Sequence, residues 1–250
     1  MPDLFAADTL IFVAIGFVAQ LFDGALGMGF GVISYTVLTG MGVPHAVVSA
    51  SVNGAKIFTG SASGLAHISH KNIDWKLFGL LAVCGSVGGV VGVLVLTRMP
   101  SDILKPVIAV YLIGVGVYIV WRAFRHIQVH VGHKRTAMVG TAGGFLEATA
   151  GVWGPLVTSN LIALGANPRY AVGSGNLAET VVALVVSLML AHHIGLENFS
   201  KAVLGLLIGA IIAAPFAARF ARQLPAKTLM VGVGLLVIVT SVYRLAQTLL

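Results

Sequence analysis

Uncharged apolar runs that are long enough to cross a lipid bilayer dominate this chain. The longest are Leu77–Thr97 with 21 residues, Gly24–Pro44 with 21 and Ala148–Asn167 with 20. About 20 apolar residues span the hydrocarbon core as a helix, and a helix satisfies its backbone hydrogen bonds internally. The runs do not alternate polar with apolar residues, as the strands of a membrane barrel would. The sequence therefore predicts an all-α polytopic membrane protein.

The composition supports the same class. Only 9% of the 250 residues are charged, 58% are hydrophobic and the mean hydropathy is +0.99, whereas soluble domains carry about 25% charged residues. The 31 glycines suit the close helix contacts that membranes favour. Cys84 is the single cysteine, so an internal disulfide and the two-cysteine metal motifs are excluded.

The second half of the chain resembles the first. Asp23 aligns with Glu147, and Pro44 with Pro168, both at a spacing of 124 residues. The segment SVNGAK, which ends at Lys56, resembles SGNLAE, which ends at Glu179, at a spacing of 123. The order of these matches predicts two transmembrane repeats, residues 1–125 and 126–250, within a single transport domain.

Each repeat is expected to contain a short apolar piece, a Gly-rich break, a second piece and three longer helices. Broken or re-entrant helices at the breaks would give about 8–10 hydrophobic helices in all. The expected ranges are 9–22, 26–41, 44–68, 75–97 and 103–122 in the first repeat, and 136–147, 151–165, 169–192, 201–219 and 227–246 in the second.

The distribution of Lys and Arg predicts how the helices are oriented, because these residues accumulate in cytoplasmic loops. Five segments per repeat place ten of them on the side of the linker Trp121–Arg135 and four on the other side, whereas four segments per repeat give eight and six. The five-segment count is favoured, and a repeat with an odd number of crossings must be inverted. We therefore expect inverted-topology repeats, with the linker in the cytoplasm and both termini outside.

Two ionisable residues are expected near the middle of matching helices. Lys56 lies near the centre of the predicted helix 44–68, and Glu179 near the centre of 169–192. A central Lys or Asp costs roughly 2.5–3.5 kcal/mol on insertion scales, so such residues face partners or water. Two interpretations stay open: a structural ion pair between the repeats, or direct contact with a substrate or a proton.

Asp23 and Glu147 each precede a Gly-rich break, in FDGALGMGFG and LEATAGVWGP. Backbone N–H groups freed at such breaks favour anions, and matching breaks in two halves indicate a transport site. The alternative is close packing of glycines, with the two acids as helix caps.

Several segments resemble the sulfite exporter TauE/SafE family, which is also grouped with the toluene sulfonate uptake permeases. They are DGALGMGFGV, GVPHAVVSASVN, KNIDWKLF, GVWGPLVTSNLI and PRYAVGSGNLAE, which are spread over nearly the whole chain. The resemblance implies a secondary transporter of sulfite, sulfonates or related organosulfur anions in a bacterial or archaeal inner membrane. It places the family's Gly-rich motifs at Gly27, Gly29 and Gly31 and at Gly151, Gly154 and Pro155. Lys56 stands where this branch of the family often has an acidic residue.

These arguments give two sets of candidate residues for transport by alternating access with coupling to protons. The substrate-binding candidates are Gly27, Met28, Gly29, Gly31, Ser51, Asn53, Lys56, Trp153, Gly154, Ser174, Asn176 and Glu179. The proton-coupling candidates are Asp23, Glu147 and Glu179.

Two other classes of protein compete with a sulfur-anion transporter. His126, His130 and His133 in the linker, with His192 and His193, suggest a transition-metal cation transporter, but histidines in a basic loop are equally ordinary. An enzyme is not expected, because HExxH and GxSxG motifs are absent, and no Walker A motif indicates ATP use. We expect no metal and no cofactor. The expected partners are a small sulfur-containing anion and membrane lipid. A homodimer is compatible with the sequence, and no nucleic-acid partner is expected.

Overall fold

The computed structural model describes residues 3–26, 29–124, 132–163, 166–223 and 226–249. Within these ranges the regular structure is helical and contains no strand. The elements are α1 (Asp3–Leu26), α2 (Phe30–Gly40), α3 (His45–Ser69), α4 (Trp75–Arg98), α5 (Ser101–Arg122), α6 (His133–Ala150), α7 (Gly154–Ala163), α8 (Pro168–Ile194), the short 3-10 helix η1 (Leu196–Asn198), α9 (Ser200–Gln223) and α10 (Ala226–Leu249).

The described helices have the lengths and surfaces of a membrane bundle. Trp75–Arg98, Arg169–Ile194 and Met230–Gln247 are each long and apolar enough to cross a bilayer. Large apolar side chains point outward from the bundle, among them Val83, 66% exposed, and Val239, 64% exposed. Such a surface suits lipid rather than water. The prediction of an all-α polytopic membrane protein is confirmed, while the inverted relation of the repeats stays a prediction.

Both helix breaks lie a few residues later than predicted. α1 continues through Asp23 to Leu26, and α6 continues through Glu147 to Ala150. Gly151 then adopts a left-handed conformation with φ +67° and closes the last turn of α6, its N–H donating to the Glu147 carbonyl oxygen. Left-handed backbone is strained for any residue with a Cβ. The two acids therefore lie in the last turns of helices and not in the gaps after them.

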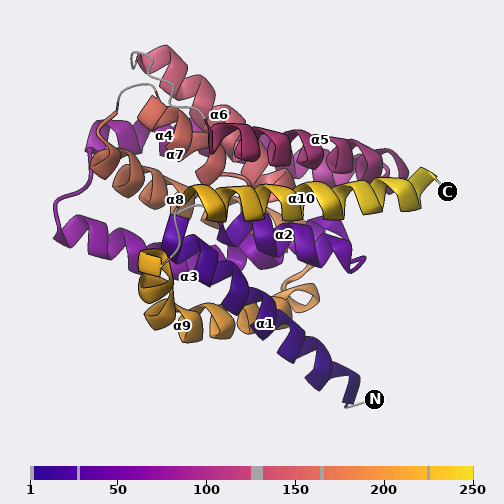
Figure 1. Cartoon of the computed structure of the whole chain (residues 1–250). Helices are drawn as coiled ribbons and strands as arrows, with labels where there is room; N and C mark the ends of the chain where they lie inside the picture. The colour runs from indigo at the N-terminus through magenta and orange to yellow at the C-terminus, as the bar shows by residue number, and fades with distance from the viewer. Residues whose placement is uncertain (1–2, 27–28, 125–131, 164–165, 224–225, 250) are drawn as a thin grey trace.

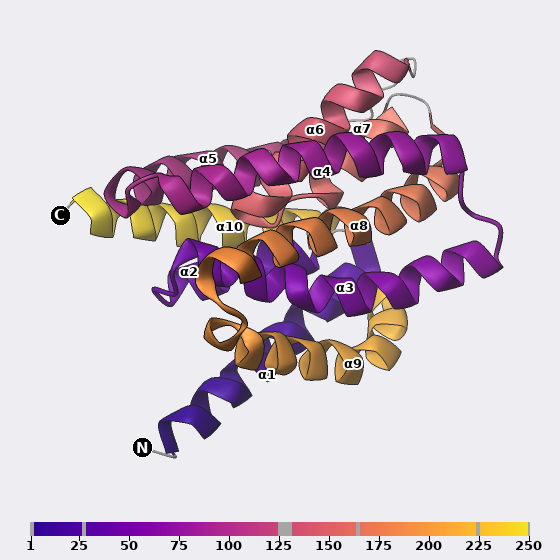
Figure 2. The same cartoon turned by 180° about the vertical axis from the view of Figure 1, so that it is seen from behind.

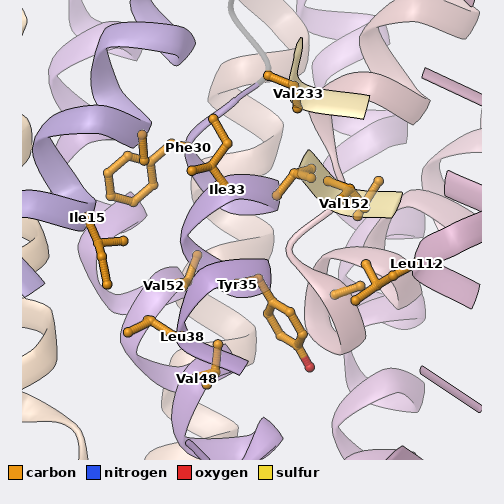
Figure 3. Packing of buried hydrophobic residues seen from close by; sticks show 14 of the residues in the cluster. Ile15, Phe30, Ile33, Tyr35, Leu38, Val48, Val52, Leu112, Val152 and Val233 are labelled. Atoms are coloured by element: carbon orange, nitrogen blue, oxygen red, sulfur yellow. The ribbon is translucent and has the colours of Figure 1, made fainter. Parts of the chain in front are cut away.

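α2 is a short helix that the other helices enclose. Its eleven residues rise about 16 Å, roughly half of the hydrocarbon thickness. Nearly all of its side chains are buried, and Figure 3 shows Phe30, Ile33, Tyr35 and Leu38 among apolar residues of the neighbouring elements. A chain break at membrane depth is tolerated where protein surrounds it.

The remaining helices pack in pairs that join the two halves of the chain. α1 packs against α9, α4 against α6, α5 against α10 and α3 against α8. Both views show the two termini toward the same end of the bundle, opposite the α3–α4 connection (Figures 1 and 2). Helices α4 and α6 approach each other so closely that a Cβ added at Gly88 would meet the carbonyl oxygen of Thr141. The α3–α8 pair holds the charged residues that the sequence singled out.

Candidate functional site

The two halves of α3 differ in burial, and Lys56 lies at the boundary. Residues 48–56 are all buried, whereas residues 57–69 are half-buried or exposed apart from Gly64. Lys56 itself is 7% exposed. Its long apolar stem therefore ends in the protein interior, where a charged group requires a partner.

Lys56 has two carboxylate partners. Its Nζ donates to Glu147 Oε1 and to Glu179 Oε1, each at 2.7 Å. Glu147 is fully buried, whereas the side chain of Glu179 is 19% exposed. The structure thus brings together Lys56 and Glu179, as the repeat alignment predicts, and it adds Glu147 from α6.

Glu147 reaches Lys56 because α6 is tied to α3 at the adjacent residue. Ser49 Oγ on α3 donates to the carbonyl oxygen of Ala148 at 2.6 Å. The two breaks also meet here, because a Cβ added at Gly31 would contact both the Gly151 carbonyl oxygen and Lys56 Nζ. Glycine at position 31 leaves the space that the lysine head group occupies.

Asp23 has a different role from its repeat partner Glu147. Its Oδ1 accepts from the N–H groups of Gly29 at 2.7 Å and Phe30 at 3.1 Å, the N-terminus of α2. A carboxylate at this position satisfies two helix donors and complements the helix dipole. The cap interpretation therefore holds for Asp23, while Glu147 forms an ion pair with Lys56. At the first break, the N–H groups of Gly29 and Phe30 are therefore occupied by Asp23 and not by an anion.

A cavity of about 410 Å³ extends from this charged cluster. Its lining comes from the end of α1, the start of α2, the second half of α3 and the first half of α8. The described lining residues are Gln20, Asp23, Phe30, Lys56, Thr59, Gly60, Ser63, His67, Val172, Asn176, Glu179 and Thr180. The volume suits a small ligand, and the polar lining supplies both donors and acceptors.

Eight of the described lining residues lie outside the two candidate sets: Gln20, Phe30, Thr59, Gly60, Ser63, His67, Val172 and Thr180. Ser63 and His67 follow Lys56 at seven and eleven residues, so they share its helix face. That spacing was a signal available in the sequence. Asn176, which was predicted, lines the cavity and donates from Nδ2 to Ser63 Oγ at 3.4 Å.

Other predicted residues lie away from the cavity lining. Asn53 is buried and donates from Nδ2 to the Ser49 carbonyl oxygen, and Ser51 donates to the Val47 carbonyl oxygen. Ser174 exchanges hydrogen bonds with the backbone of Asp74, which joins α8 to the α3–α4 connection.

The predicted residues of the second break are buried between helices. Trp153 is fully buried, and its Nε1 donates to the Gly175 carbonyl oxygen at 3.1 Å. Gly154 begins α7 and is buried. Gly29 immediately precedes α2 and its N–H donates to Asp23, whereas Gly27 and Met28 fall outside the described residues.

The histidines considered for a metal are only partly described. His126 and His130 lie outside the described residues. His192 and His193 face each other edge to face with ring centroids 5.6 Å apart, and His193 Nδ1 lies 2.7 Å from the Met189 carbonyl oxygen. Among the described residues there is no group of three or more His, Cys, Asp or Glu side chains that could hold a metal ion.

Comparison with known proteins gives the family. The sulfite exporter TauE/SafE family model matches residues 12–244. The chain belongs to the sulfite exporter TauE/SafE family. It is also 34% identical over 235 residues to a Bacillus subtilis (strain 168) protein named "Probable membrane transporter protein YtnM". The matched region covers 90% of this chain and 78% of that protein. No solved structure matches the chain.

Membership of the TauE/SafE family makes this protein a membrane transporter. The family is one of transporters and not of enzymes. The family model spans both helix breaks and the residues of the charged cluster. The cavity beside Lys56 is therefore the candidate transport site.

Proposed function

We propose that this TauE/SafE protein is a secondary transporter of sulfite, sulfonate or related organosulfur anions in the inner membrane of a bacterium or archaeon. The observation that carries the proposal is the position of Lys56, whose ammonium group lines a polar cavity where the two helix breaks meet. Sulfur oxyanions present several acceptor oxygens and a negative charge. A buried ammonium group is the donor best suited to them in this cavity.

Lys56 has donor capacity left for a substrate. An ammonium group offers three N–H donors, and within the described part of the chain Glu147 and Glu179 accept two of them. The third donor is available to an oxygen atom of a bound anion. Thr59, Ser63 and Asn176 lie along the same cavity and can bind further oxygen atoms.

The repeat architecture supports alternating access. Exchanging α1–α5 with α6–α10 in order converts the α1–α9 pair into the α6–α4 pair, and maps α3–α8 and α5–α10 onto themselves. An internal two-fold relation of this kind is typical of transporters whose halves rock about a central site. The cavity runs from Lys56 toward His67 and Val172, the ends of α3 and α8 that the positive-inside rule assigns to the cytoplasm.

The proposal is tested by ligand-induced thermal stabilisation of the purified protein in detergent. The panel contains sulfite, sulfate, thiosulfate, sulfoacetate, taurine and chloride, with wild type, Lys56→Met and the control Gly40→Ala. Gly40 lies at the exposed end of α2 with no heavy atom within 4 Å of an added Cβ. A specific ligand at about 100 times its Kd stabilises by about 2.7 kcal/mol.

We expect a sulfur oxyanion, and not chloride, to stabilise wild type and Gly40→Ala. The same anion is expected to have no effect on Lys56→Met. Stabilisation of Lys56→Met equal to that of wild type would contradict the proposal.

A further inference from the structure

We propose that Glu179 carries the proton that couples anion movement to the proton gradient, while Glu147 stays ionised as the fixed counter-ion of Lys56. This inference rests on the proposed function, because it assigns roles within the same cavity. It divides two carboxylates that bind the same nitrogen atom at the same distance into one exchangeable and one permanent partner.

The charge balance of the cluster requires such a division. Lys56 contributes one positive charge, and Glu147 and Glu179 contribute two negative charges when ionised. An anion that joined this cluster unchanged would enter a site that already carries a net negative charge. Because like charges repel strongly at low dielectric constant, binding is favourable only if one carboxylate is neutralised by a proton.

Exposure identifies which carboxylate can take up that proton. The Glu179 side chain is 19% exposed and lines the cavity, whereas the Glu147 side chain is fully buried and is not part of the described lining. Water in the cavity can therefore deliver a proton to Glu179 directly. Glu147 is shielded from the cavity by its burial, and its second oxygen, Oε2, is buried without a partner among the described residues.

The other titratable groups that face Glu179 do not fit the coupling role. Asp23 from α1 shares the cavity, but its carboxylate is held by two backbone N–H groups at the start of α2. His67 lies about three helix turns from Lys56, at the other end of the lining. α4, α6 and α7 also pack on α8 and contribute no residue to the described lining.

The coupled step balances in charge and protons. An anion oxygen accepts a hydrogen bond from the third N–H group of Lys56 Nζ. Glu179 takes up one proton from the bulk solution through water in the cavity and becomes neutral, so that it is no longer a counter-ion of the ammonium group. The cluster then holds Lys56 with two negative charges, Glu147 and a monovalent anion, as it did before with two carboxylates. When the anion is released on the opposite side of the membrane, Glu179 releases its proton to that same side, so one proton crosses with each anion.

The experiment measures the pH dependence of anion affinity for the purified full-length protein. Methanesulfonate is used as the probe, because it is monovalent, as this step requires, and its charge does not change over the pH range, unlike that of sulfite. The variants are Glu179→Gln, Glu179→Asp, Glu147→Gln and Asp23→Asn. Gln at position 179 imitates the neutral, protonated acid, and Asp retains a titratable carboxyl group.

In wild type we expect the Kd to rise about tenfold per pH unit, which is the slope for one proton taken up per anion. Glu179→Gln should bind at all pH values with a Kd that changes less than about twofold. Glu179→Asp and Asp23→Asn should keep the wild-type slope, whereas Glu147→Gln removes one negative charge from the cluster and should weaken the slope. If Glu179→Gln does not fold, a slope lost in Glu179→Asp or in Asp23→Asn overturns the assignment.

Failure of this inference is distinguishable from failure of the proposed function. Anion binding with no pH dependence in wild type, or with the full slope retained in Glu179→Gln, overturns the coupling role and leaves the transport site intact. Absence of binding by every sulfur oxyanion overturns both.

Discussion

At the scale of single residues, the environment of Lys56 explains why a charge is tolerated at this depth. Its ammonium group has two carboxylate partners at 2.7 Å and is backed by Gly31. Removing the cation would leave Glu147 buried without a partner. A side chain at position 31 would fill the space beside Gly31 and displace the ammonium group itself. Both changes can be tested with matched controls.

We predict that Lys56→Met lowers the free energy of unfolding by about 3–5 kcal/mol, because an uncompensated buried carboxylate is left behind. The double variant Lys56→Met/Glu147→Gln should recover part of this loss, since Gln keeps the shape of Glu147 without its charge. Chemical unfolding in detergent measures both values. A double variant that is less stable than the single one would contradict the ion-pair account.

We also predict that Gly31→Ala is strongly destabilising, by about 1–3 kcal/mol, whereas Gly40→Ala in the same helix is not. A Cβ at position 31 would meet the Gly151 carbonyl oxygen and Lys56 Nζ, and also lie 2.8 Å from Lys56 Cε, while a Cβ at position 40 meets nothing within 4 Å. Thermal unfolding of the two variants measures the contrast. Equal melting temperatures would show that the site has more space than the structure gives it.

The candidate site could be predicted from the sequence only in part, and particular residues show why. The pairing of Lys56 with Glu179 follows from their equivalent positions in the two repeats. The contact of Lys56 with Glu147 does not, because it depends on α6 continuing to Ala150 and on the Ser49 hydrogen bond to Ala148. Asn53 was expected in the cavity, but it turns back to the Ser49 backbone, a local alternative that side-chain type alone does not exclude.

At the scale of elements, the short helix α2 is enclosed and the longer helices pack across the two halves. Each longer helix except α1 could be placed to within a few residues, because apolar runs bounded by charges and prolines fix its length; α1 (Asp3–Leu26) is longer at both ends than the predicted 9–22. The breaks were placed too early, since glycine content marks a flexible stretch but not the residue that leaves the helix. In the second break that residue is Gly151, with φ +67°.

The close contact between α4 and α6 gives a prediction at this scale. Gly88→Ala should lower stability by about 1–3 kcal/mol, because its Cβ would meet the Thr141 carbonyl oxygen and lie 2.9 Å from the Phe145 nitrogen. Gly79→Ala, in the same helix with nothing within 4 Å, should be neutral or stabilise by up to about 1 kcal/mol. Thermal unfolding measures both variants. A stable Gly88→Ala protein would mean that α4 and α6 are further apart.

At the scale of the whole molecule, the Lys and Arg counts predict the orientation in the membrane. We predict that a cysteine at Lys76 reacts with a membrane-impermeant maleimide only from the cytoplasmic side, and one at Met99 only from outside. Both positions are exposed, and Cys84→Ser removes the native thiol. Labelling in intact cells and in inverted vesicles measures the two sides, and the reverse pattern would contradict the orientation.

The central claim is that Lys56 binds the sulfur oxyanion that the protein transports. The most direct test is uptake of radiolabelled sulfite and a sulfonate into proteoliposomes containing wild type, Lys56→Met, Lys56→Met/Glu147→Gln or Gly40→Ala. We predict saturable uptake by wild type and Gly40→Ala, and a reduction of about 30-fold or more in both Lys56 variants, as expected when a buried charged partner is lost. Uptake that is unchanged in the folded double variant, or no uptake of any sulfur oxyanion by wild type, would contradict the claim.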